Sequence, residues 1–154
     1  MDSFNNIQIG LVAERLAEVD STNAELVRRL QSGVALPEGI VLSANHQTPG
    51  RGLGGTQWHT QAGTNWTGSI YLRPAHLAAD LGFRLSQVVA LAIIRACEVL
   101  LRRYPLLASP SGRGTIDASD KIGKISIKWP NDVLVGDRKI AGVLLQSVLQ
   151  GQRL

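Results

Sequence analysis

Cysteine is nearly absent from this sequence, which has only Cys97 among its 154 residues. A single cysteine cannot form an internal disulfide, so a small secreted fold held by disulfides is excluded. No hydrophobic run reaches the roughly 18 apolar residues of a membrane span, and the N-terminus lacks a basic-then-apolar signal pattern. We therefore expect a cytoplasmic protein without a membrane segment, long enough to bury a core of its own.

Acidic residues are missing from a long central segment, since residues 39–79 contain neither Asp nor Glu. The whole chain carries a net charge of +4. A segment free of carboxylates favours the binding of an anionic ligand. Nucleic acid would be one such ligand, but the sequence has no cluster of Lys and Arg and no nucleic-acid-binding motif, so we expect no nucleic-acid partner.

A glycine-rich stretch, residues 46–58, lies inside this acid-free segment. Four of the six residues from Gly50 to Gly55 are glycine, and Arg51 stands between the first two. Glycine lets the backbone approach a ligand closely, and successive free N–H groups form a concave site for anions. Arg51 adds a planar cation suited to carboxylate or phosphate. We interpret the stretch as a mobile loop that folds over an anionic ligand.

Three other interpretations of the stretch have to be compared with this one. Gly50, Gly52 and Gly55 match the spacing of a dinucleotide fingerprint, but that motif requires a helix directly afterwards, whereas the β-prone residues 56–60 follow. A phosphate-binding P-loop would end in Gly-Lys-Ser/Thr, which is absent. The third interpretation is a glycine-rich hairpin turn without a ligand.

Hydrophobic periodicity predicts two helices. The shorter covers residues 24–31, after the potential caps Ser21, Thr22 and Asn23, and the longer runs from a cap at Asp80 to about residue 103. We expect strands over the following segments, the first of which also fits a helix: 11–19, 40–44 and 64–72. Residues 104–123 are rich in Pro, Gly and Ser and predict a surface loop.

Residues 125–129 predict a further strand, with apolar residues on one face and Lys128 on the other. Such a lysine either extends to solvent at a sheet edge or faces a polar cavity. Beyond the turn at Asn131 and Asp132, Gly136-Asp137 is a hairpin signal between residues 133–135 and 138–149.

Four short motifs occur in an order that resembles the biotin protein ligase family, the biotin–[acetyl-CoA carboxylase] ligases. The resemblance implies an α+β fold with a mixed, largely antiparallel sheet and helices packed on one face, related to lipoate ligases. The motifs are Asp20-Ser21-Thr22-Asn23, Gln47-Thr48-Pro49-Gly50-Arg51-Gly52 with Gly55 and Trp58, Lys128-Trp129-Pro130-Asn131-Asp132, and Lys139-Ile140-Ala141-Gly142.

The resemblance implies an enzyme with a two-step reaction. The biotin carboxylate attacks the α-phosphate of ATP, giving biotinyl-5′-adenylate and pyrophosphate, with Mg²⁺ accompanying ATP. A lysine of a biotin carboxyl-carrier domain, from acetyl-CoA carboxylase or a related carboxylase, then displaces AMP. Two alternatives are a lipoate or octanoate transferase of the same superfamily and a non-catalytic remnant that only binds biotin.

The resemblance also implies roles for particular residues, with Lys128 and Arg51 as the catalytic pair. No residue is implied as a metal ligand. The implied biotin-binding residues are Ser21, Thr22, Asn23, Gln47, Gly50, Arg51, Gly52 and Lys128. The implied ATP- and adenylate-binding residues are Arg51, Trp58, Lys128, Asn131 and Lys139.

The sequence departs from the family where many members carry further basic residues, because Leu53, Gly54 and Thr56 stand there. With fewer cations in the loop, we expect weaker retention of the adenylate. A Leu53→Arg variant should therefore release adenylate more slowly than the parent, and equal release rates would contradict this expectation.

We expect residues 1–154 to form a catalytic domain that is truncated at its C-terminal end. About twenty residues precede Ser21, so we expect no N-terminal DNA-binding domain and no repressor function. The resemblance is compatible with a monomer or a homodimer, the latter through an edge strand near residue 143.

Overall fold

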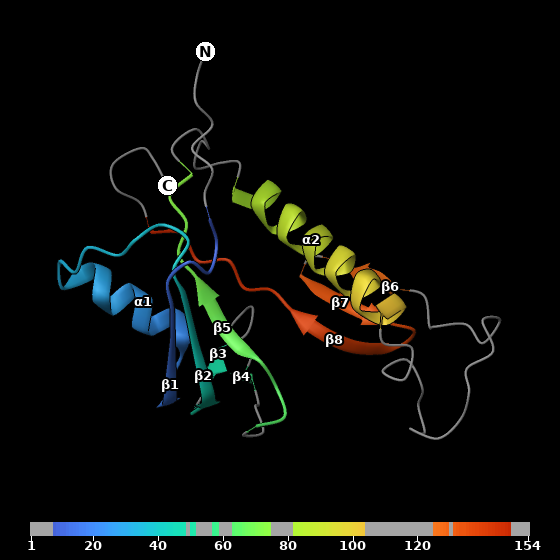
Figure 1. Ribbon diagram of the computed structural model, residues 1–154, viewed down its shortest axis with the longest axis horizontal. Coiled ribbons are helices and arrows are strands. Elements are labelled where there is room, and N and C mark those ends of the chain that lie inside the picture. Colours follow the sequence, from blue (N-terminus) through green and yellow to red (C-terminus); the bar gives the residue numbers. More distant parts are fainter. Residues whose placement is uncertain are drawn as a thin grey trace, which may run out of the picture. The chain divides into compact units, whose positions relative to one another are not determined.

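The computed structural model divides the chain into two compact units (Figure 1). The first unit comprises Met1–Leu77 with Val148–Leu154, and the second comprises Ala78–Ser147. The residues that the structure describes are 8–48, 50–51, 57–58, 63–74, 82–103, 125–129 and 131–148.

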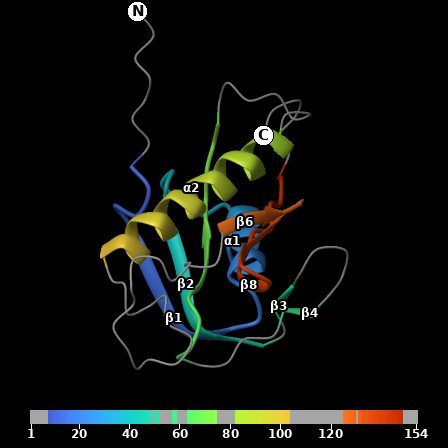
Figure 2. The ribbon, with the colours of Figure 1, turned by 90° about the vertical axis from the view of Figure 1, so that its right-hand side faces the viewer.

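A three-stranded sheet forms the centre of the first unit. Its middle strand, β2 (Val41–Gln47), runs parallel to β1 (Ala13–Val19) and antiparallel to β5 (Thr67–Ile70). Figures 1 and 2 show β2 between its two neighbours. The register places Ser69 of β5 opposite Leu42 of β2, so both side chains lie on the same face of the sheet.

Helix α1 (Thr22–Gln31) packs against this sheet through contacts with β2 and β5. It begins at Ser21, whose backbone is extended and whose Oγ accepts a hydrogen bond from the N–H of Ala24 at 3.3 Å. It ends before Gly33, whose φ of 81° lies in the left-handed region that favours glycine. Leu26 of α1 and Leu42 of β2 are buried and form the core of this unit.

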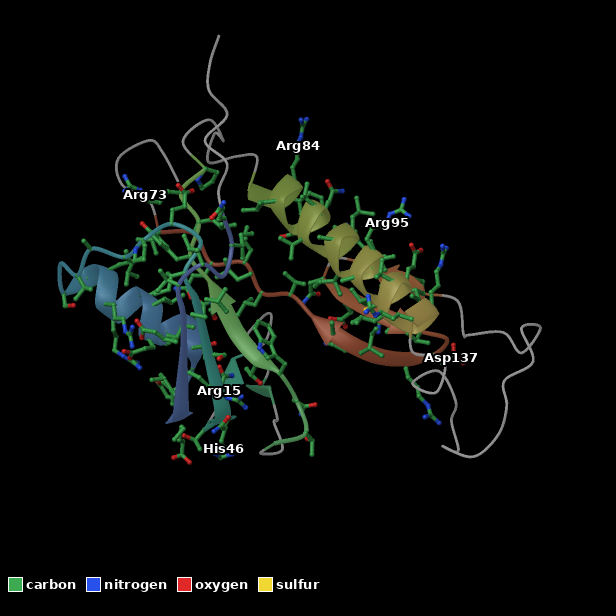
Figure 3. The ribbon with its side chains drawn as sticks, in the orientation of Figure 1. Arg15, His46, Arg73, Arg84, Arg95 and Asp137 are labelled. Carbon is green, nitrogen blue, oxygen red and sulfur yellow. The ribbon has the colours of Figure 1, made fainter. Side chains whose placement is uncertain are left out.

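The second unit packs helix α2 (Gly82–Arg103) against a three-stranded antiparallel meander. The strands are β6 (Ile125–Lys128), β7 (Asp132–Val135) and β8 (Arg138–Gly142). Val133 of β7 and Ala90 of α2 are buried. In Figure 3 the labelled arginines of α2, Arg84 and Arg95, project from the side of the helix that faces away from the strands.

The observed elements confirm the α+β class with mixed, largely antiparallel pairing. Residues 11–19, which fitted either a strand or a helix, contain β1, and both predicted helices are present. The predicted hairpin forms at Gly136, whose φ is 57°, but β8 ends at Gly142 and not near residue 149. The predicted cap at Asp80 and the predicted loop at 104–123 lie outside the described residues.

Neither of the described helices is long and apolar enough to cross a membrane.

Candidate functional site

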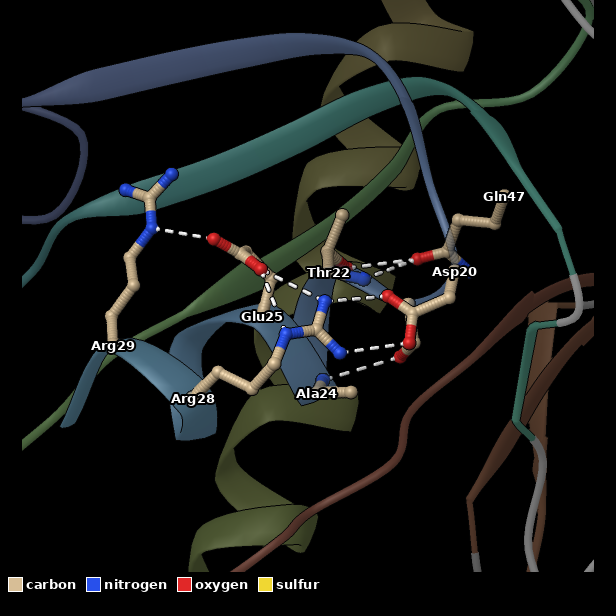
Figure 4. Close-up of polar contacts among 8 residues, drawn as sticks. Asp20, Thr22, Ala24, Glu25, Arg28, Arg29 and Gln47 are labelled. Carbon is tan, nitrogen blue, oxygen red and sulfur yellow. Dashed lines mark hydrogen bonds and ion pairs between the residues drawn. The ribbon is translucent and has the colours of Figure 1, made fainter. Parts of the chain in front are cut away.

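A buried cluster of polar side chains lies where α1 begins and β2 ends. The backbone N–H of Thr22 donates a hydrogen bond to Gln47 Oε1 at 2.8 Å, and the Thr22 hydroxyl donates to the same oxygen at 3.0 Å (Figure 4). The Thr22 hydroxyl also lies 2.8 Å from the hydroxyl oxygen of Ser69 on β5. Thr22 and Gln47 are almost fully buried. The helix and two strands therefore meet in one polar cluster, which we call the Thr22 cluster.

Hydrogen bonding in the Thr22 cluster orients its side chains. Because the hydroxyl proton of Thr22 is given to Gln47, the hydroxyl of Ser69 is the donor to Thr22 Oγ1. Two donors converge on Gln47 Oε1, so the oxygen of this amide faces Thr22. A cluster with fixed donors and acceptors suits the recognition of a polar ring rather than of a hydrocarbon.

Ser21 and Asp20 stabilise the turn that presents Thr22. Asp20 forms two hydrogen bonds with the guanidinium of Arg28, at 2.7 and 2.8 Å, and Arg28 also contacts Glu25 (Figure 4). The hydrogen bonds from Arg28, followed by that from the backbone N–H of Ser21, hold the pKa of Asp20 well below its usual range. Arg29 and Arg28 lower the pKa of Glu25 in the same way. The capping interpretation of Ser21 is thus confirmed as a structural role.

We expect Asp20→Asn to lower the free energy of unfolding by roughly 1 kcal/mol at neutral pH, since the pair with Arg28 is partly exposed and screened by solvent. A carboxyl with a depressed pKa in the folded state contributes fully above its unfolded pKa of about 4 and progressively less below it. Urea unfolding of parent and variant at pH 7, 5 and 3 should show a difference that shrinks only at pH 3. An equal difference at all three values would contradict this prediction.

The glycine-rich stretch begins and ends in paired backbone. Strand β3 (Gly50–Arg51) pairs antiparallel with β4 (Gln57–Trp58), so that Gly50 lies opposite Trp58. A strand rather than a helix follows the glycines, which excludes the dinucleotide fingerprint. The paired ends agree with the hairpin interpretation of the backbone. Its remaining named residues, Gly52, Leu53, Gly54, Gly55 and Thr56, lie outside the described residues, as does Pro49.

The second unit contains the other residues that the sequence singled out. Lys128 ends β6 with an exposed side chain, and Asn131 accepts a hydrogen bond from the N–H of Val143 at its backbone carbonyl, at 2.8 Å. Lys139 Nζ lies 2.7 Å from Asp132 Oδ1. The structure thus brings Lys139 to a carboxylate.

The predicted residues fall into two sets, one in each unit. Thr22 and Gln47 are in direct contact in the first unit, while Asn23 is the second residue of α1 and is half-buried. Two contributors were not foreseen, namely Ser69 in the Thr22 cluster and Asp132 as the partner of Lys139. The sequence feature that could have indicated Ser69 is its position between Gly68 and Ile70 in a predicted strand. Alternation along the strand places the Ser69 side chain on the face opposite to theirs.

Comparison with known proteins gives consistent results. The model of the biotin/lipoate A/B protein ligase family matches residues 15–154. A biotin–[acetyl-CoA-carboxylase] ligase of Paracoccus denitrificans is 38% identical over 135 residues, covering 86% of this chain and 45% of the relative. The corresponding ligase of Mycobacterium tuberculosis is 33% identical over 131 residues, covering 85% of this chain and 42% of the relative.

A solved structure is similar as well. The biotin protein ligase of Leishmania major in complex with biotinyl-5-AMP superposes with a TM-score of 0.65 at 29% identity, covering 93% of this chain and 54% of that protein. The chain spans less than half of the two curated relatives. The family model covers nearly the whole chain, and the chain belongs to the biotin/lipoate A/B protein ligase family.

Proposed function

We propose that this chain carries the biotin-activating part of an enzyme that attaches biotin to a lysine of a carrier domain, using ATP. The Thr22 cluster is the observation that carries the proposal, because it assembles three oriented polar side chains in a fold shared with a biotin protein ligase of known structure. A related structure contains biotinyl-5-AMP, the intermediate that the proposal requires.

Biotin recognition is assigned to the first unit. The ureido ring of biotin has one carbonyl acceptor and two N–H donors, and its burial is favourable only when these groups are hydrogen-bonded. Thr22, Gln47 and Ser69 form a cluster of matching chemistry. We assign the polar ring to this cluster, with Ser21 and Asn23 beside it. Gly50, Arg51 and Gly52 are assigned to the carboxylate end of biotin.

Activation of biotin joins two anions, so the site has to supply positive charge. A biotin carboxylate oxygen attacks the α-phosphorus of ATP, the bond from that phosphorus to the bridging oxygen breaks, and pyrophosphate leaves with the bonding electron pair. We assign Arg51 and Lys128 to neutralise the carboxylate and the α-phosphate in this step. Trp58 and Asn131 are assigned to the nucleotide, Trp58 beside the adenine.

Transfer of biotin consumes the adenylate. The neutral amine of an acceptor lysine attacks the acyl carbon, the acyl–oxygen bond to phosphate breaks, and AMP leaves while the nitrogen loses a proton. The two curated relatives act, by name, on acetyl-CoA carboxylase. We propose the biotin carboxyl-carrier domain of this carboxylase, or of a related one, as the acceptor.

Mg²⁺ enters this proposal as part of the substrate. Among the described residues there is no group of three or more His, Cys, Asp or Glu side chains that could hold a metal ion. Asp132, the carboxylate nearest to Lys128 in the strand register, lies against Lys139. We propose that the phosphates of ATP and water are the main ligands of Mg²⁺, since this ion keeps several waters and binds substrate phosphates.

The test is to incubate the chain with biotin and magnesium ATP and to detect biotinyl-adenylate by mass spectrometry, with lipoate in a parallel reaction. Formation of biotinyl-adenylate without lipoyl-adenylate would support the proposal. Preference for lipoate would favour a lipoate or octanoate transferase of the same superfamily. Biotin binding without any adenylate would favour a remnant that only holds biotin.

We also propose a cytoplasmic location, where ATP and the carrier domain are available.

We further propose a homodimer that is formed through β8. Within the described part of the chain β8 pairs with β7 alone, which leaves its other edge for a second strand. Sedimentation velocity should show a dimer, and a monomer at every concentration tested would contradict this assembly.

A further inference from the structure

Two lysines flank one carboxylate on the β6–β7–β8 sheet. Lys128 of β6 lies directly opposite Asp132 of β7 in the antiparallel register. Opposite charges in such a position ordinarily form a cross-strand ion pair. Lys139 of β8 lies opposite Leu134, two residues from Asp132 and on the same face of the sheet. Both lysines are thus within reach of Asp132, and either one could neutralise it.

The carboxylate of Asp132 contacts the more distant lysine. Its Oδ1 lies 2.7 Å from Lys139 Nζ, and the Asp132 side chain is only 19% exposed. This oxygen is buried and forms no hydrogen bond of acceptable geometry, so the contact with Lys139 is an ion pair. A carboxylate oxygen that is removed from water requires a compensating charge, and Lys139 supplies it.

The shape of the β7–β8 hairpin explains this choice. The two-residue turn at Gly136 and Asp137 pairs Val135 with Arg138, which puts Lys139 on the face of Asp132. Farther from the turn, the register shifts between Leu134 and Val133, and this shift places Gly142 opposite Asp132. Glycine has no side chain to occupy that position, and a lysine is long enough to reach a diagonal neighbour.

Lys128 remains without a side-chain partner in the part of the chain that the structure describes, and it is exposed. We propose that Lys139 is a positioning residue: it neutralises Asp132, so that the ammonium of Lys128 stays available to an anionic ligand. The identification of this ligand as biotin carboxylate and ATP phosphate rests on the proposed function. Lys139 then acts through Asp132 and Lys128 and does not bind the nucleotide itself.

The test is limited acylation of the full chain with an amine-reactive acetylating reagent, followed by peptide mass spectrometry normalised to the denatured protein. Ion pairing protects an amine because the partner carboxylate holds the amine in place and shields it from the reagent. In Asp132→Asn, labelling of Lys139 should rise roughly two- to fivefold, while labelling of Lys128 stays unchanged. A rise at Lys128, or no rise at Lys139, would overturn the proposal.

A second variant tests the competition between the two lysines. In Lys139→Met, labelling of Lys128 should fall roughly two- to fivefold because Asp132 now attracts it. The double variant Asp132→Asn/Lys139→Met should restore labelling of Lys128 to the parent level, and Lys139→Arg should retain it. Unchanged labelling of Lys128 in folded Lys139→Met would overturn the proposal.

These measurements use neither biotin nor ATP, so they are independent of the proposed function. A parent chain that forms no adenylate would contradict the proposed function and leave the labelling result to decide the pairing. In an active parent, Lys139→Met should lower the rate of adenylate formation, and the double variant should recover it. An active Lys139→Met variant with parental rates would overturn the positioning role.

Discussion

Replacing Lys128 by alanine should lower the rate of biotinyl-adenylate formation about a hundredfold or more, the usual effect of removing one group that stabilises transition-state charge. Lys128 is exposed at the end of β6, and its side chain has no partner in the described part of the chain, so its charge is available for the role at the α-phosphate that we propose. The rate is measured by mass spectrometry of the adenylate under single-turnover conditions. Biotin affinity, measured by calorimetry, should change by about tenfold or less, because the polar ring is assigned to the Thr22 cluster.

Arg138→Ala is the matched control for Lys128→Ala. Arg138 lies in the same sheet, is exposed and carries the same charge, so the variant changes the net charge of the chain equally. We expect its adenylation rate to remain near the parental value. Equal losses of adenylation rate in the two variants would mean that only the net positive charge of the unit matters. A parental rate in Lys128→Ala would exclude this lysine from the chemistry.

Thr22→Val should weaken biotin binding about tenfold or more and lower the free energy of unfolding by about 1–3 kcal/mol. Valine has nearly the shape of threonine but no hydroxyl, so Ser69 loses its hydrogen bond to Thr22, and Gln47 Oε1 loses the hydroxyl donor while it retains the backbone N–H of residue 22. Since Thr22 is 2% exposed, water cannot replace these hydrogen bonds. Urea unfolding gives the change in stability, and calorimetry with biotin gives the change in affinity.

Thr22→Ser separates the hydroxyl from the packing of the side chain. Serine keeps both hydrogen bonds and removes one methyl group, whose loss costs about 1 kcal/mol of stability. We expect its biotin affinity to stay close to that of the parent. Parental affinity in Thr22→Val, measured on folded protein, would show that the Thr22 cluster supports the fold without taking part in biotin recognition.

Local signals in the sequence predicted most of the secondary structure. Apolar spacing predicted α2, and the capping residues around Ser21 predicted where α1 begins, because helix ends depend on residues adjacent in the chain. Gly136-Asp137 predicted the β7–β8 turn, since a two-residue hairpin needs a positive φ. The sequence left residues 11–19 ambiguous, because a short apolar run fits the hydrophobic periodicity of a helix and that of a strand. Pairing with β2 decided that this segment contains the strand β1.

The sequence by itself determined the order of motifs, and through it the family, as well as the residues that could carry the chemistry. The tertiary structure alone decided which of them touch. Ser69 joins Thr22 only because the register of β2 and β5 brings them together across 47 positions of the chain. Asp132 likewise contacts Lys139 rather than Lys128, its partner in the register. Contacts of this kind depend on strand register, side-chain length and the burial of charge, which no local pattern encodes.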